Sequence, residues 1–158
     1  MTTESLFETP HQERYFEDYL EGAIHTFGRV AVHEKMIIEF ASRYDPQFFH
    51  VDPEKAEDSI YGGLISSGWH TTAIMMSQLA LYYFSDVSSM GSPGLTDLRW
   101  MIPVRPGDTL SVRTTTTEAR RSSSKPDRGI IKTFIEVLNQ GSAVVMDLKA
   151  TNFIACRS

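Results

Sequence analysis

The sequence has a single cysteine, Cys156, so the chain cannot form a disulfide within itself. It has no apolar run near the ~18 residues that a membrane-spanning helix needs. Residues 1–14 carry three glutamates and lack the basic start and apolar stretch of a secretory signal. These absences exclude a fold stapled by internal disulfides, and we expect a cytoplasmic protein that does not insert into a membrane.

Basic residues are also in the minority, since 20 Asp and Glu stand against 15 Lys and Arg, for a net charge of −5. This balance argues against broad binding to nucleic acid or to an anionic membrane surface. The hydrophobic content of 41% is typical of a globular chain, and a length of 158 residues suits one domain. We expect an N-terminal leader over residues 1–18 and a single domain over residues 19–158.

The first part of the domain predicts one strand and two helices. Residues 24–32 are rich in β-forming side chains and predict the strand. From Glu34 the apolar positions recur at helical spacing, and the predicted helix ends where Asp45 precedes a proline. Residues 45–51 then predict an irregular aromatic loop. The sequence Asp52-Pro53-Glu54 has the pattern of a helix start, with an acceptor at the cap and proline at the first position.

A second long helix, predicted over residues 69–84, is apolar around most of its circumference, and Ser66 and Ser67 can cap it. Helices of this kind are normally buried, so we expect it at the centre of the fold. Four strands are predicted after it, over residues 95–101, 110–119, 130–138 and 143–154. The pattern indicates the α+β class, with an antiparallel sheet wrapped around a central apolar helix.

Residues 40–53 resemble the hydratase motif of MaoC-like dehydratases and (R)-specific enoyl-CoA hydratases, which has an aspartate and a histidine five positions later. Asp45 and His50 occupy these places. The resemblance extends over residues 19–155 through a glycine-rich segment, a Pro-Gly-Asp turn and a late strand connection, at residues 62–68, 103–108 and 139–141. The sequence departs from the family at Gln47-Phe48, where many members have Asn-Pro, and this departure bears on the shape of the pocket.

The resemblance implies a hot-dog fold and the reversible addition of water to a 2-enoyl-CoA, which gives an (R)-3-hydroxyacyl-CoA. It implies that Asp45 and His50 share the proton transfers and that the backbone N–H of Gly68 polarises the thioester carbonyl. Coenzyme A enters as part of the substrate, so no separate cofactor is expected. The family also implies a homodimer or a larger homo-oligomer, which would cover the edge strand that such a sheet leaves open.

These residue types suit that chemistry. An imidazole titrates near neutral pH and can serve as base or acid, while a carboxylate beside it can hold the same water. Backbone N–H groups in the first turn of a helix have no partner within the helix, and a glycine such as Gly68 lets a ligand approach them closely. The residue types alone do not assign the base to one of Asp45 and His50 and the acid to the other.

Six further residues are predicted to contact the substrate: Gln47, Phe49, Gly63, Ser67, Trp69 and Arg105. Arg105 is a candidate for binding the phosphates of coenzyme A. Trp69, together with Met75, Met76 and Trp100, is a candidate for lining an acyl pocket, although aromatic and methionine side chains at helical spacing more often form core.

Structural interpretations stay open beside the functional ones. Asp45 can be a simple turn residue before a proline, His50 a loop histidine, and Asp52 a helix cap. Gly68 can simply permit close packing of the helix on the sheet. His70 can face the site, but a structural role is the main alternative for it. No metal is expected, because no third nitrogen or sulfur donor stands at a familiar spacing from these residues.

Two other functions also remain open. A hot-dog thioesterase would usually need a carboxylate on the central helix, and the sequence has no Asp or Glu between Ile65 and Ser85. The other function is that of a non-catalytic module that binds acyl-thioesters or a partner protein. The presence of both Asp45 and His50 argues against it.

Overall fold

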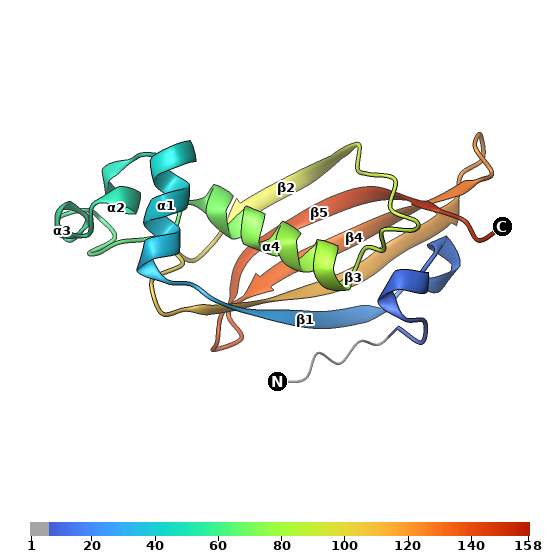
Figure 1. The fold of residues 1–158 in the computed structure, drawn as a ribbon, viewed down its shortest axis with the longest axis horizontal. Coiled ribbons are helices and arrows are strands. Elements are labelled where there is room, and N and C mark those ends of the chain that lie inside the picture. Colours follow the sequence, from blue (N-terminus) through green and yellow to red (C-terminus); the bar gives the residue numbers. More distant parts are fainter. Residues whose placement is uncertain (1–6) are drawn as a thin grey trace.

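The computed structural model describes residues 7–158. One five-stranded antiparallel sheet has the strand order β1-β3-β4-β5-β2, and the helix α4 lies across one of its faces (Figure 1). The shorter helices α1, α2 and α3 gather at the end of the molecule where α4 begins. The elements are 3-10 helices His11–Glu13 and Phe16–Asp18, β1 Ile24–Ala31, α1 Glu34–Tyr44, α2 Phe48–Val51, α3 Pro53–Ala56, α4 Gly68–Tyr82, β2 Gly94–Trp100, β3 Thr109–Arg121, β4 Arg128–Leu138 and β5 Val144–Ala155.

The long elements confirm the predicted pattern, while the predicted loop over residues 45–51 is wrong in its second half. There the chain closes one helical turn, α2, in which the N–H of Asp52 donates to the carbonyl of Phe48 at 2.9 Å. The ring of Phe49 packs edge-on against His50 and lies near Tyr61. The contact with Tyr61 reaches outside the turn and helps to hold α2, which is too short for periodicity to reveal.

The inner face of the sheet follows the predicted alternation. Ile131, Ile135 and Val137 of β4 and Met146 and Leu148 of β5 are almost completely buried. The polar side chains between them point to the other face, as the two-residue repeat of a strand requires. The core therefore lies between this face and α4.

The expectation that α4 is buried is correct for one face only. Ile74, Met75 and Leu79 are buried against the sheet, whereas Trp69, Met76 and Leu81 are each about half exposed, at 56%, 47% and 60%. One sheet can cover only one stripe of a helix, so an apolar circumference leaves the opposite stripe uncovered in the single chain.

The segment just before β1 packs on the C-terminal end of α4, opposite the end where α1 to α3 lie (Figure 1). The buried guanidinium of Arg14 donates to the carbonyl of Tyr82 at 2.7 Å, and the hydroxyl of Tyr19 donates to the carbonyl of Tyr83 at 2.6 Å. Both bonds satisfy carbonyls that have no partner within the helix. Residues 1–6 of the predicted leader lie outside the described residues.

Among residues 7–158, no helix is long and apolar enough to cross a membrane.

Candidate active site

Three segments meet at the start of α4: the end of α1, the turn α2 and the extended residues 64–67. Asp45 follows α1 directly, with φ −156° and ψ 68°, because Pro46 keeps it out of the helical region. The N–H of Ile65 donates to the carbonyl of Phe49 at 3.1 Å, and the N–H of Ser66 donates to the carbonyl of Val104 at 2.8 Å. These backbone bonds fix the approach to α4 against the turn α2 and against the segment that follows β2.

Asp45 and His50 form a pair in this corner. The Nε2 atom of His50 lies 3.2 Å from Oδ2 of Asp45, and the imidazole is almost fully buried. The predicted five-residue spacing therefore brings the two side chains into contact, with the turn α2 folding His50 back toward the end of α1.

The Nδ1 atom of His50 acts as a hydrogen-bond donor. Nδ1 lies 2.8 Å from the carbonyl oxygen of Ile65, which can only accept a hydrogen bond, so Nδ1 carries a proton. The other ring nitrogen, Nε2, faces the carboxylate of Asp45. The arrangement can move one proton between the pair and a bound molecule.

The Asp45 carboxylate accepts two further hydrogen bonds, from the Ser67 hydroxyl at 2.7 Å and from the Gln47 amide at 2.7 Å. Burial by itself would raise the pKa of Asp45. The bonds from Ser67 and Gln47 and the nearby His50 ring outweigh it, so the pKa of this carboxyl lies below its ordinary value. Asp45 is therefore ionised across the neutral range.

The first turn of α4 supplies backbone donors. Ser67 is its N-cap, and the Ser67 hydroxyl accepts a hydrogen bond from the N–H of Trp69 at 3.3 Å. Gly68 follows as the first helical residue, and no acceptor among the described residues binds its N–H. This donor is thus available to a ligand at the positive end of the helix.

A cavity of about 570 Å³ lies beside the pair. His50, Gly68, Gln47 and Phe49 line it, while Asp45 touches the lining residues Gln47 and His50 without lining it itself. Four of the nine predicted site residues therefore face one hollow. Trp100, which the sequence offered as a candidate for an acyl pocket, lines the cavity as well. The remaining lining residues are Tyr61, Ile65, Ser66, Thr71, Met101, Ile102, Pro103, Val104 and Val145.

The other predicted substrate contacts lie around this cavity. Ser67 does not line the cavity, but its hydroxyl donates a hydrogen bond to Asp45. Gly63 and Arg105 lie together outside the lining, where Arg105 is exposed and donates to the carbonyl of Tyr61 at 2.5 Å. Trp69 is exposed on α4 and packs edge-on against Trp100 at 5.1 Å between ring centroids.

Two residues near the site, Asp52 and His70, have the structural roles that the sequence left open for them. Asp52 caps α3 by accepting from the N–H of Lys55 at 3.1 Å. His70 is buried, and its Nδ1 lies 2.7 Å from the hydroxyl of Ser66 while its ring stacks on Phe40. Burial lowers the pKa of His70. Within residues 7–158 no three His, Cys, Asp or Glu side chains gather closely enough to hold a metal ion.

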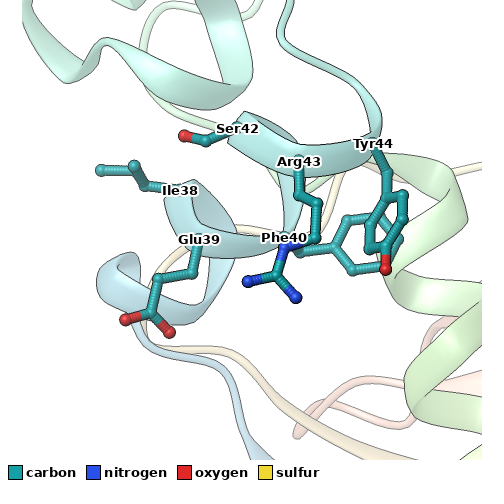
Figure 2. Close-up of a pocket in the computed structure, with 6 residues that line it drawn as sticks. All are labelled: Ile38, Glu39, Phe40, Ser42, Arg43 and Tyr44. Carbon is teal, nitrogen blue, oxygen red and sulfur yellow. The ribbon is translucent and has the colours of Figure 1, made fainter.

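A second hollow, of about 820 Å³, is lined by α1 alone (Figure 2). Phe40 and Tyr44 extend toward α4, while Ile38 and Ser42 point the other way. Neither Asp45 nor His50 lines it, so the cavity beside the pair is the candidate active site.

Comparison with known proteins identifies the fold and the family of the chain. The described chain has the hot-dog fold, which the double-hot-dog protein RV0216 of Mycobacterium tuberculosis shares at 17% identity, a TM-score of 0.78, and coverage of 91% of this chain and 44% of that one. Residues 16–136 match the MaoC-like domain family, and the chain belongs to that family.

Two further solved structures are similar. A MaoC-like dehydratase from Rhodospirillum rubrum is 37% identical, with a TM-score of 0.85 over 92% of this chain and 99% of that one. The R-hydratase PhaJ1 from Pseudomonas aeruginosa is 21% identical, with a TM-score of 0.73 over 91% of this chain and 86% of that one, and at this identity it bears on the fold alone.

Proposed function

We propose that the protein is an enoyl-CoA hydratase, a lyase that adds water reversibly to a 2-enoyl-CoA and gives an (R)-3-hydroxyacyl-CoA. The observation that carries the proposal is the contact of Asp45 with Nε2 of His50 beside the unbound N–H of Gly68, at one cavity. Membership of the MaoC-like family and the 37% identity to a MaoC-like dehydratase support the same reaction class.

In the proposed reaction, a water held by Asp45 and His50 attacks the β-carbon of the enoyl group. The pair takes one proton from this water and returns one proton to the α-carbon, so it ends in its starting protonation state. Negative charge develops meanwhile on the thioester oxygen, where the N–H of Gly68 donates to it. A preorganised donor of this kind is worth about 3–4 kcal/mol in the transition state.

Coenzyme A is the proposed carrier of the acyl group, and Arg105 is the proposed contact of its phosphates. The guanidinium of Arg105 is exposed next to Gly63, just outside the cavity lining. A glycine beside an arginine leaves room for a phosphate to approach both side chain and backbone.

The test uses purified protein and crotonyl-CoA, with loss of the enoyl absorbance followed against release of free thiol. A hydratase consumes the enoyl signal and releases no thiol, and chiral analysis gives the (R)-product. Thiol release without hydration identifies a thioesterase instead. Saturable acyl-CoA binding with no turnover of any enoyl-CoA identifies a non-catalytic module, and either of these outcomes overturns the proposal.

A homodimer is the proposed assembly. β2 is an edge strand of the sheet, and nearly all of its residues are exposed in the single chain, including Leu95 and Trp100. The exposed stripe of α4 adds further apolar surface, including Met76 and Leu81. Open strand edges and exposed apolar surface are commonly covered by a second chain. Light scattering at micromolar concentration should give at least a dimer, and a monomer would contradict this.

A further inference from the structure

The indole of Trp100 lies directly on Gly68. A Cβ atom added to Gly68 would lie 2.4 Å from Cε2 of Trp100 and 2.5 Å from Cδ2, far inside van der Waals contact. Only a residue without a side chain permits this approach at the first position of α4. The last residue of β2 is thereby brought against the helix start whose N–H is available to a ligand.

Several contacts hold the indole in this place. Its Nε1 donates to the hydroxyl of Thr72 at 3.3 Å, and Trp69 packs edge-on against the ring. The backbone is fixed as well, since Trp100 pairs with Met146 on β5 and the N–H of the next residue, Met101, donates to the carbonyl of Val145 at 2.8 Å. The ring is thus positioned by both its own strand and α4.

Trp100 is also part of the cavity wall. The segment from Trp100 to Val104 supplies one run of the lining, while Phe49 and Tyr61 come from the region of α2 and α3. The three atoms nearest to a Cβ added at Gly68 all belong to the ring of Trp100, which also lines the cavity. An acyl chain whose carbonyl accepts from the N–H of Gly68 and whose reacting carbons lie at Asp45 and His50 would pass this indole where the chain continues along the segment from Trp100 to Val104.

We propose that Trp100 is the residue that determines acyl-chain length, by restricting the cavity to short 2-enoyl groups. The inference rests on the proposed hydratase function. A large rigid side chain beside the carbonyl site favours small acyl groups that pack against it and excludes longer ones that need its space.

The test compares Trp100→Ala with the parent protein on crotonyl-CoA and trans-2-octenoyl-CoA. The expected result is a rise of about tenfold or more in the ratio of kcat/KM for octenoyl-CoA to that for crotonyl-CoA, since removal of the indole opens space for several carbons. Trp100→Leu should shift the ratio in the same direction by less. If circular dichroism shows that Trp100→Ala does not fold, the comparison is made with Trp100→Leu instead.

Leu95→Ala is the matched control. Leu95 lies on the same strand with a similar exposed fraction, 48% against 43% for Trp100, but does not line the cavity. The control should leave the ratio within about twofold of the parent, and light scattering of both variants checks that assembly is unchanged.

The outcomes separate the two proposals. A ratio that rises less than about tenfold in Trp100→Ala, or that rises equally in Leu95→Ala, overturns the role of Trp100 while leaving the hydratase intact. A parent protein that hydrates neither substrate nor any other enoyl-CoA overturns the proposed function first, and the role of Trp100 falls with it.

Discussion

The hydroxyl of Ser67 lies 2.7 Å from Oδ2 of Asp45, although 22 positions separate the two residues in the chain. The same hydroxyl accepts from the N–H of Trp69 and caps α4. One side chain therefore ties the orientation of the proposed catalytic carboxylate to the start of the helix that bears Gly68. Sequence reasoning identified Ser67 as a cap and a substrate contact, and the contact with Asp45 adds a third role.

Ser67→Ala should lower kcat/KM for crotonyl-CoA by about ten- to a hundredfold, because a hydrogen bond to a charged group is worth about 1.5–3 kcal/mol. Removing this donor also raises the pKa of Asp45, so the acidic limb of the pH profile should move to higher pH. Ser67→Thr keeps the hydroxyl and should restore much of the rate. Ser77→Ala removes a serine hydroxyl elsewhere on α4 and should change neither quantity. An unchanged profile in Ser67→Ala would show that Ser67 does not act through Asp45.

Gly68→Ala should destabilise the protein by about 1–3 kcal/mol, because the added methyl group overlaps the indole of Trp100. In a Trp100→Ala background the sign should reverse, since alanine is better than glycine in a helix by roughly 0.5–1 kcal/mol. Urea denaturation of the four proteins gives the coupling free energy directly. Equal effects of Gly68→Ala in both backgrounds would contradict the contact.

His25 should make the protein less stable in mild acid. Burial, and then the charge of Arg14, lowers the pKa of His25 from 6.5 to about 4. Between these two pH values His25 is protonated in the unfolded chain but not in the folded chain. The free energy of unfolding therefore decreases as pH falls from about 6.5 toward about 4. Between pH 8 and pH 5 this amounts to about 2 kcal/mol.

His25→Phe removes this contribution and keeps a ring for Phe7 to stack on. Nδ1 of His25 has no hydrogen-bond partner among the described residues, so its loss should cost little at neutral pH. Denaturation curves at the two pH values should show a smaller acid loss in His25→Phe than in the parent. The exposed His33, replaced by glutamine, should leave the loss as it is. If His25→Phe loses as much stability between pH 8 and pH 5 as the parent does, His25 is not the cause of the acid loss.

Arg14→Ala should lower the free energy of unfolding by about 2–3 kcal/mol, because charged hydrogen bonds to the carbonyls at the end of α4 are lost. The guanidinium also lies 3.8 Å from the ring centre of Phe7. Arg14→Lys keeps the charge but not the planar fork, so an intermediate loss is expected. Thermal unfolding measures both variants, and a loss under about half a kcal/mol in Arg14→Ala would mean that the segment before β1 does not stabilise the helix.

Local patterns predicted most of the fold, and the exceptions have a common cause. The alternation through β4 and β5 and the proline after Asp45 are local signals, and the structure agrees with both. The turn α2 is held by contacts of Phe49 with residues outside it, Tyr61 and Ile65, which no local period reveals.

The same distinction holds at the site. The spacing of Asp45 and His50 could be recognised because both lie on one short segment of chain. The sequence offered Trp100 as a candidate for an acyl pocket, but not its packing on Gly68. That contact joins a strand end to a helix start 32 residues earlier, so it required the folded chain. The exposed stripe of α4 could not be predicted for a related reason, because the hydrophobicity of a helix does not show which of its faces the sheet covers.

In the proposed reaction, Asp45 and His50 act as one proton-transfer unit. The most direct test is kcat/KM for crotonyl-CoA in Asp45→Asn, His50→Gln and the double variant, each shown to be folded. We expect each single change to lower kcat/KM by about a hundredfold or more. The double variant should be little less active than the less active of the two single variants, because the effects of groups that act together are not additive. A double variant that hydrates crotonyl-CoA as fast as the parent, or single losses that simply add, would contradict it.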